Sequence, residues 1–414
     1  MIKEIIVGCW KIVSGIAACI TLPGSVELLG LSLAALLPRR RVASSSTNGP
    51  WRVVIVVPAH NEELAITSCV QSLLCADAGD MQVAVYVIAD NCTDSTAQLA
   101  QLAGATVLKR TDDVERGKGY ALRFAFSYLE SLESLESPAY DCVLVVDADT
   151  VVASNFILAA AGAMRRGAPA VQARYLARNT EENTRTRLMG FALRAFNVVR
   201  PLGREKLGLS AGILGNGFGL RRETVEAVPY VAYSVVEDLE YHLALVRTGR
   251  RVSFVDETTV LGEMPVRGKG VKTQRTRWEG GRLRMLFEKA PGLLRDVLLG
   301  RLRCLEPLLE LLLLPLAFHV MLLVVAALSP SPIIREIGLS GLGIVAIHLL
   351  VTVVIGEDAW RDLATLANAP VYILWKLLLI PSLIRNASAK HSWVRTDRNG
   401  DGNGNHRGND RADT

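Results

Sequence analysis

The feature that most restricts the fold of this chain is a series of short, continuously apolar segments separated by stretches with helical periodicity. The apolar segments read RVVIVVPA (52–59), QVAVYVIAD (82–90), ATVLKR (105–110) and DCVLVVDADT (141–150). Between them apolar residues recur at helical spacing, for example in LAITSCVQSLLCA (64–76). Strands that are apolar throughout are buried on both faces, as in a parallel sheet covered by helices on two sides. The sequence therefore predicts an α/β fold with a mostly parallel sheet from Trp51 to about Ala290.

Three of these predicted strands end in polar clusters. The clusters are His60-Asn61-Glu62, Asp90-Asn91 and Asp147-Ala148-Asp149. Each one alone is more often a turn or a helix cap. Three together favour a ligand site, because ligands of open α/β sheets bind beyond the carboxyl ends of the strands. No GxGxxG or Walker sequence follows the first strand, which removes the main support for a dinucleotide-binding fold or a P-loop ATPase.

The pair Asp147 and Asp149 has two interpretations. Like charges this close repel one another, but a divalent cation between them would make the arrangement favourable, and Mg²⁺ or Mn²⁺ would then hold phosphate. The alternative is a turn in which the side-chain oxygens satisfy free backbone N–H groups. The two residues alone leave both interpretations open.

Two further segments of the central region contain candidate site residues. GILGNGFGLRRETV (212–225) is a glycine-rich strand in which missing side chains would let a sugar approach the backbone, or else a bulged edge strand. SVVEDLEYHLALVRTG (234–249) is expected to be a helix with Glu237 and Asp238 in its first turn. Acidic residues are favoured there by the helix dipole alone, so the local pattern does not require a catalytic role.

The segment QRTRWEGGRLR (274–284) also reads as a helix. Gln274, Arg277 and Trp278 would then lie on one face, because they are spaced at i, i+3 and i+4. A guanidinium group binds phosphate oxygens and an indole ring stacks on a sugar, so this face suits a sugar diphosphate. The alternative is a basic helix at a membrane interface.

Three apolar segments are long enough to cross a bilayer. They are residues 12–37, 307–328 and 337–356, and the last two should form a hairpin. Glu27 and the Pro23-Gly24 pair are unusual within the first one. The following Arg39-Arg40-Arg41 cluster should hold that end, and the central region, in the cytoplasm.

The rest of the C-terminal region is expected to lie on or outside the membrane. Residues 369–384 form a shorter apolar stretch that includes Lys376, which favours an interfacial or re-entrant helix. From Thr396 the chain is rich in Gly, Asn, Asp and Arg and is expected to be disordered.

Composition supports this division of the 414 residues. The mean hydropathy of +0.28 is high for a chain with 21% charged residues, because the apolar excess is concentrated near the two ends. We expect an N-terminal transmembrane helix and basic linker (1–50), a central α/β domain (51–290), C-terminal membrane helices with an interfacial segment (291–395) and a disordered tail (396–414). A net charge of +5 without interleaved aromatic and basic residues argues against a nucleic-acid partner. The seven cysteines have no CxxC spacing and are expected to be reduced.

Five motifs occur in an order that resembles a known enzyme family. They are VPAHNEE (57–63), DNCTDST (90–96), VVDADT (145–150), VVEDLEYH (235–242) and QRTRW (274–278). Together they resemble the inverting family 2 glycosyltransferases with the GT-A fold, a Rossmann-like fold. More narrowly, they are similar to the membrane-bound branch that includes cellulose, hyaluronan and bacterial exopolysaccharide synthesis enzymes. The resemblance covers roughly residues 51–290, and flanking membrane helices are also typical of that branch.

The resemblance implies a role for each matching residue. The donor-binding residues would be Pro58, His60, Glu62, Asp90, Lys118, Asp147 and Arg277. Of these, Asp90 would contact the uracil of a UDP-sugar. Two substitutions, His60 for the commoner Tyr and Ala89 for the commoner Asp, leave the details of donor-base binding open.

The catalytic and metal-binding roles follow in the same way. Asp147 and Asp149 would bring a divalent cation, Mg²⁺ or Mn²⁺, to the diphosphate. Asp238 would be the general base that removes the proton of the acceptor hydroxyl, with Glu237 beside it. Residues that close the site over the diphosphate and the acceptor would be Gln274, Arg277 and Trp278.

The resemblance thus predicts an inverting hexosyltransferase of the inner cell membrane, multi-pass, with its catalytic domain in the cytoplasm. It would add one sugar from a nucleotide-sugar to a lipid-linked or saccharide acceptor in extracellular polysaccharide biosynthesis. Membrane lipid and polysaccharide-assembly proteins would be its partners. One alternative is a processive synthase that extrudes a β-linked polymer, although few membrane helices follow the central domain. Another is a catalytically silent membrane scaffold that kept the fold.

Overall fold

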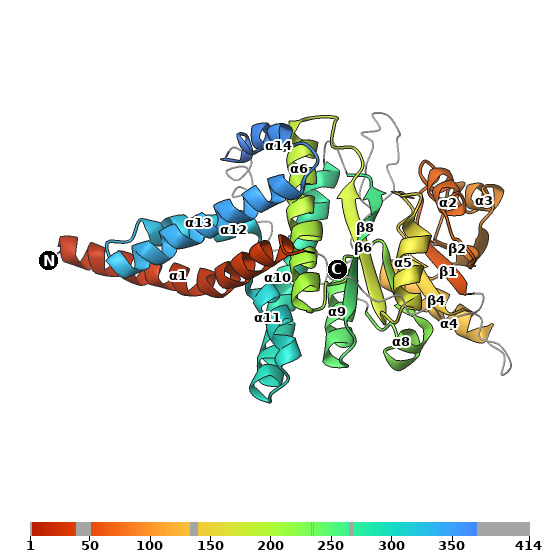
Figure 1. Cartoon of the computed structure of the whole chain (residues 1–414), viewed down its shortest axis with the longest axis horizontal. Helices are drawn as coiled ribbons and strands as arrows, with labels where there is room; N and C mark the ends of the chain where they lie inside the picture. Colours follow the sequence, from red (N-terminus) through yellow and green to blue (C-terminus); the bar gives the residue numbers. More distant parts are fainter. Residues whose placement is uncertain are drawn as a thin grey trace, which may run out of the picture.

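The central region of the chain forms one mixed sheet of eight strands, in the order β3-β2-β1-β4-β7-β6-β8-β5. Figure 1 shows this sheet on the right, with β1, β2, β4, β6 and β8 labelled. The computed structural model describes residues 2–38, 51–132, 140–232, 234, 236–264 and 269–370, with side chains of the last range from Gly280 onward. The strands are β1 (Arg52–Ala59), β2 (Gln82–Asp90), β3 (Thr106–Arg110), β4 (Cys142–Val145), β5 (Thr150–Val152), β6 (Ala170–Ala177), β7 (Phe218–Arg221) and β8 (Val252–Gly262).

The sheet has a parallel half and a mixed half. The strands β1, β2, β3 and β4 pair in parallel, as the continuous apolar runs predicted. Beyond β4 the direction reverses, because β7 pairs antiparallel with both β4 and β6. Four of the seven neighbouring pairs are parallel, which confirms the predicted α/β fold.

Helices cover both faces of this sheet and form two separate cores. Along β1, Val53, Ile55 and Val57 face one core, and Val54 and Val56 face the other. The first core is closed by α2 (Ile66–Leu74), α3 (Thr96–Leu102) and α5 (Phe156–Arg165). The second is closed by α4 (Lys118–Ser131), α8 (Arg222–Ala227) and α9 (Glu237–Arg247). A strand that is apolar throughout is therefore required at this position, because neither of its faces meets water.

The structure excludes one of the two interpretations of the glycine-rich segment 212–225. Only Phe218–Arg221 forms a strand, β7, and it lies between β4 and β6 in the middle of the sheet. The interpretation of this segment as a bulged edge strand is therefore wrong. Residues 212–217 form a loop that approaches the site described below.

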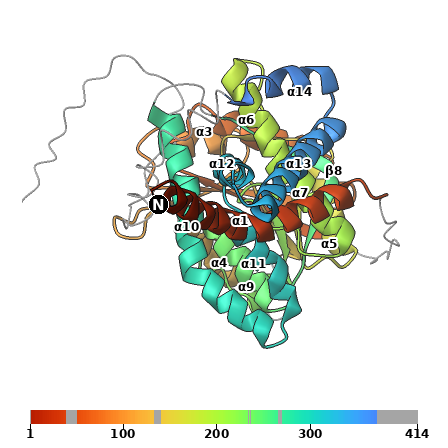
Figure 2. The ribbon, with the colours of Figure 1, turned by 90° about the vertical axis from the view of Figure 1, so that its left-hand side faces the viewer.

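Two described helices are long and apolar enough to cross a membrane, α1 (Ile2–Ala35) and α13 (Pro332–Ile355). They lie side by side with α12 (Leu316–Ala327) in a bundle that projects from the sheet (Figures 1 and 2). The remaining helical elements are α6 (Thr184–Arg194), η1 (Ala195–Val199), α7 (Arg200–Leu207), α10 (Lys269–Leu298), η2 (Leu302–Cys304), α11 (Leu305–Leu312) and α14 (Ala359–Leu366). Of these, α14 lies next to α6, away from the sheet (Figure 1).

The expected straight span over residues 307–328 is broken. Its residues belong to α11 and α12, which meet at an angle of 79° and count as a third span only if the bent pair is one. Leu313 adopts an extended conformation directly after α11, and Pro315 precedes α12. A proline lacks the N–H that a continuous helix requires and disfavours helical geometry in the residue before it, which accounts for the break. The expected pairing of this segment with residues 337–356 is retained through α12 and α13.

Several predictions fall outside the described residues. They concern the Arg39-Arg40-Arg41 cluster, almost all of the interfacial segment 369–384, and the tail from Thr396.

The long apolar helix α1 is fixed to the central domain by close packing and buried charge. Gly203 of α7 lies directly against the backbone of Leu31. Glu27, which is buried, pairs with Arg204 of α7 at 3.2 Å. The acidic residue that was unusual for a bilayer span is thus part of an ion cluster at the junction, where a buried charge has the partner it requires.

Candidate active site

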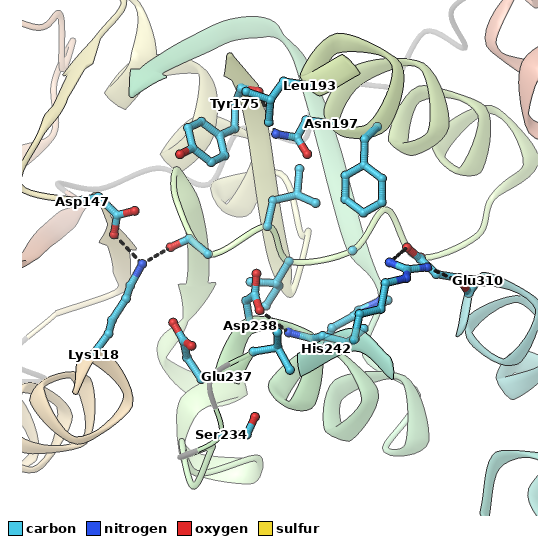
Figure 3. Close-up of a pocket in the computed structure, with 18 of the residues that line it drawn as sticks. Lys118, Asp147, Tyr175, Leu193, Asn197, Ser234, Glu237, Asp238, His242 and Glu310 are labelled. Atoms are coloured by element: carbon cyan, nitrogen blue, oxygen red, sulfur yellow. Dashed lines mark hydrogen bonds and ion pairs between the residues drawn. The ribbon is translucent and has the colours of Figure 1, made fainter. Parts of the chain in front are cut away.

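A cavity of about 960 Å³ lies between the sheet and the candidate membrane helices (Figure 3). On the side of the sheet it is lined by the start of α4, the turn after β4, the loop before β7 and the start of α9. Five of the residues predicted for the site line it, namely Lys118, Asp147, Asp149, Glu237 and Asp238. The acidic motifs that lie far apart in the sequence therefore face one common space.

The turn after β4 presents Asp147 to the first residue of α4. Lys118 Nζ forms an ion pair with Asp147 Oδ1 and donates a hydrogen bond to the carbonyl oxygen of Gly215 at 2.5 Å. Burial by itself lowers the pKa of Lys118, but the negative charges of the nearby carboxylates outweigh it and raise this pKa. Lys118 is thus a fixed positive charge beside the predicted metal-binding pair.

The second acidic pair begins α9, on another wall of the cavity. Asp238 Oδ1 accepts a hydrogen bond from the backbone N–H of Leu239 at 2.8 Å. Burial raises the pKa of Asp238, and burial together with the negative charge of Asp238 raises the pKa of Glu237 to about 7. The helix dipole favours acidic residues at this position, but it does not require that both of them line a cavity. A carboxylate with a raised pKa is a stronger base, as general-base catalysis needs.

The loop before β7 connects the two acidic pairs. The carbonyl oxygen of Gly215 accepts the hydrogen bond from Lys118, and a Cβ atom at Gly215 would lie 3.2 Å from Asp238 Oδ2. The close approach that the glycine-rich segment indicated is therefore an approach to Lys118 and Asp238.

Four predicted donor-binding residues do not line this cavity: Pro58, His60, Glu62 and Asp90. Asp90 is buried and pairs with Arg110 at 2.7 Å. His60 Nδ1 lies 2.7 Å from the carbonyl oxygen of Asp90, and the backbone N–H of Glu62 donates to Thr96 Oγ1 at 2.7 Å. Their position at the carboxyl ends of β1 and β2 is as expected, and their contact with a donor stays a prediction.

The helix predicted for the QRTRW segment is present as the first part of α10. Gln274, Arg277 and Trp278 therefore share a helical face, but the described side chains of α10 begin only at Gly280. Their contact with the diphosphate or the acceptor remains a prediction.

The two carboxylates of the turn after β4 are ligands of the kind that a divalent cation prefers, and their role as metal ligands stays a prediction. Among the side chains that the structure describes, no three His, Cys, Asp or Glu residues are grouped as metal ligands. Asp147 and Asp149 would therefore supply two oxygen ligands, and the diphosphate and water would supply the others. Mg²⁺ is commonly bound in this way, through one or two carboxylates and substrate phosphates.

The other half of the cavity was not predicted from the sequence. Its charged lining residues are Arg200, Arg204, Arg282 and Glu310, and its apolar ones are Leu28, Phe196, Leu313, Leu314, Pro315 and Leu316. The guanidinium groups of Arg200 and Arg282 lie 4.7 and 5.5 Å from the ring centre of Phe196. Of the apolar residues, Leu28 belongs to α1 and Phe196 to η1, and the other four form the break between α11 and α12 and the first residue of α12. One signal was present in the sequence, since Glu27 in an apolar helix requires a buried cationic partner.

Family models match most of the described chain. The model described as "Glycosyl transferase family group 2" matches residues 142–374, and the one described as "Glycosyl transferase family 2" matches residues 54–228. The first match includes both acidic pairs, and the second includes Asp147 and Asp149 but ends before Glu237.

Individual relatives are more distant. The beta-monoglucosyldiacylglycerol synthase of Nostoc sp. is 28% identical over 279 residues, which are 64% of this chain and 58% of that protein. The probable glycosyltransferase YdaM of Bacillus subtilis is 24% identical over 56% of this chain and 55% of its own length. The chain thus matches little more than half the length of these relatives.

One solved structure is similar over almost its whole length. The mannosyltransferase PcManGT from Pyrobaculum calidifontis, in complex with GDP-Man and Mn²⁺, superposes with a TM-score of 0.54 at 17% identity. The similarity covers 89% of this chain and 99% of that one. At this level of identity it shows that the two chains share a fold.

Proposed function

Because the chain belongs to glycosyl transferase family group 2, we propose that its cavity transfers one sugar from a UDP-sugar to an acceptor hydroxyl at the membrane surface. One observation carries this proposal. A single cavity joins the two acidic pairs to the apolar side chains of the membrane helices. A donor diphosphate near the acidic pairs and a membrane-bound acceptor near the apolar side chains would therefore lie in the same cavity.

The donor half of the site would act on the leaving group. A divalent cation held by Asp147 and Asp149 would offset the negative charge that develops on the diphosphate. Lys118 presents a second positive charge on the same wall, already fixed by Asp147 and Gly215. A preorganised charge of this kind stabilises the transition state without further rearrangement.

The acceptor half would act on the nucleophile. Asp238 takes the proton of the acceptor hydroxyl while the hydroxyl oxygen bonds to the anomeric carbon of the donor sugar. At the same time the bond between the anomeric carbon and the diphosphate oxygen breaks. A single displacement of this kind inverts the configuration of the sugar. Glu237, whose pKa lies at about 7, keeps a second negative charge near Asp238 once both are ionised and makes Asp238 a stronger base.

The remaining predicted residues complete the donor site in this proposal. Pro58, His60, Glu62 and Asp90 would hold the nucleotide at the ends of β1 and β2. The face of α10 that includes Gln274, Arg277 and Trp278 would close over the diphosphate and the acceptor.

We place the acceptor in the membrane-side half of the cavity, and we expect it to be a lipid or a lipid-linked saccharide. Leu28 and the segment Leu313–Leu316 offer an apolar surface there, next to the candidate membrane helices. The Nostoc relative is named for a lipid product, which supports this choice. A role in extracellular polysaccharide assembly at the inner membrane, with assembly proteins as partners, completes the proposal.

Single addition is favoured over processive synthesis. The described part of the chain has two candidate spans, or three with the bent pair, which are few for a channel that conducts a polymer. Product length measured with the purified enzyme separates the two reactions, since a polymer would refute single addition.

The proposal is tested by screening UDP-sugars and other nucleotide sugars for release of nucleotide diphosphate in membranes that contain the full chain. Release should be abolished by EDTA, and release by the chain purified in detergent should require an added lipid extract as acceptor. Release that persists in EDTA would refute the metal site, and the absence of donor binding would favour the silent scaffold.

Topology is tested separately. A reporter fused after Arg41 should be cytoplasmic, since the basic cluster marks the inner side. A reporter found outside would refute the cytoplasmic position of the central domain.

A further inference from the structure

Asn216 has a confined position between two glycines in the loop before β7. Its side chain is fully buried. Gly215 and Gly217 have φ angles of 80° and 70°, a region that favours glycine. A Cβ atom at Gly217 would lie 2.6 Å from Cγ2 of Val260. The loop is therefore held closely between α9 and β8, and Asn216 has little freedom to move.

The amide of Asn216 contacts both ends of the turn that follows β4. Its Oδ1 accepts a hydrogen bond from the backbone N–H of Asp147 at 3.1 Å. Its Nδ2 donates to Thr150 Oγ1 at 2.8 Å, and the Thr150 hydroxyl donates in turn to Asp149 Oδ1 at 3.3 Å. The donor and acceptor roles along this chain are consistent, because the backbone N–H can only donate and the carboxylate accepts.

A second buried amide holds the backbone of Asn216. Gln172 Nε2 donates to the carbonyl oxygens of Asn216 and Ala173 at 2.7 and 2.9 Å, and its Oε1 accepts from the backbone N–H of Leu214 at 2.9 Å. Gln172 is also fully buried. A buried amide costs free energy unless it is hydrogen-bonded. The hydrogen bonds of Asn216 and Gln172 hold the loop before β7 and the turn after β4 in place.

We propose that Asn216 is a positioning residue for the predicted cation site. It fixes the backbone at Asp147 and, through Thr150, orients the carboxylate of Asp149. This inference rests on the proposed function, because it assumes that the two carboxylates hold a divalent cation. Residues that orient metal ligands commonly change metal affinity about 10- to 100-fold when they are removed.

The test measures Mn²⁺ binding, by electron paramagnetic resonance, to the purified full chain in the presence of UDP. Asn216→Ala removes the hydrogen bonds to Asp147 and to Thr150. Thr150→Val removes only the connection to Asp149, because valine has nearly the same shape as threonine but no hydroxyl. Each should weaken Mn²⁺ binding, by about 10- to 100-fold for Asn216→Ala. The double variant should bind no more weakly than Asn216→Ala alone, because Thr150 acts through the same chain of hydrogen bonds.

Asn179→Ala is the matched control. Asn179 also bonds to backbone at both ends of its amide, accepting from Met264 N and donating to Met264 O, but it does not line the cavity. This variant should bind Mn²⁺ as the wild type does, even if its unfolding temperature falls.

Three results would overturn the inference. The first is a folded Asn216→Ala variant that binds Mn²⁺ with wild-type affinity. The second is a loss of Mn²⁺ affinity in Asn179→Ala equal to that in Asn216→Ala. If Asn216→Ala does not fold, wild-type affinity in Thr150→Val would overturn it instead. Wild-type protein that binds no Mn²⁺ with UDP would overturn the metal site itself, so the two failures are distinguishable.

Discussion

The attachment of α1 to the central domain can be tested by the substitution Gly203→Ala. An added Cβ atom would lie 2.8 Å from the carbonyl carbon of Leu31 and 2.9 Å from its Cα, whereas ordinary contact begins at 3.4 Å. The obstacle is helix backbone, which cannot rotate away as a side chain can. The two helices must therefore separate by roughly 1 Å at this point. Separation would also weaken the adjacent pair of Glu27 and Arg204, which is buried.

The expected cost is about 1–3 kcal/mol for the forced separation, and more if the buried ion pair breaks. Gly30→Ala is the matched control, because it changes the same residue type in α1 and a Cβ atom there has nothing within 4 Å. Both variants gain up to about 1 kcal/mol in helix propensity, so their difference reports the steric conflict alone.

Thermal unfolding of the purified full chain in detergent gives the comparison. The Tm of Gly203→Ala should lie below that of Gly30→Ala by about 2 °C for each kcal/mol. Equal values of Tm would refute the close packing of α1 on α7.

Three further predictions concern the acidic pairs. Asp149→Asn should abolish divalent-dependent release of nucleotide diphosphate, while Asp80→Asn, an exposed aspartate that pairs with Arg165, should leave it unchanged; retained turnover in Asp149→Asn would refute the metal role. Asp238→Asn should still bind donor but lose about 10²- to 10⁴-fold in transfer, and normal transfer would remove it as the base. Since the pKa of Glu237 lies at about 7 and both carboxylates must be ionised, kcat/KM should fall about tenfold from about pH 8 to about pH 6. This fall in kcat/KM should disappear in Glu237→Gln. If the same pH dependence persists in that variant, the pKa of about 7 belongs to another group.

Several elements could be predicted because their signals are local. The apolar run before Asp147 requires a strand buried on both faces, and the structure confirms it as β4 between two cores. Glu237 and Asp238 were expected at the start of a helix and begin α9. The family was correctly inferred from the order of the motifs.

Other features were missed because their signals are not local. The break at Pro315 was overlooked, since hydropathy over a window does not register one missing N–H group. The glycine-rich segment was compatible with an edge strand, and only the pairing of β7 with β4 and β6 excluded it.

The sequence by itself determined the parallel strands, the helices between them and the long apolar segments near the two ends, because periodicity and apolar length act over a few neighbouring residues. Only the tertiary structure decided which buried groups meet. Arg204 lies 177 residues from Glu27 in sequence, and Asn216 lies 69 residues from Asp147, yet each is bonded to the other. A buried charge or amide must find a partner, but the packing of the whole chain selects which one.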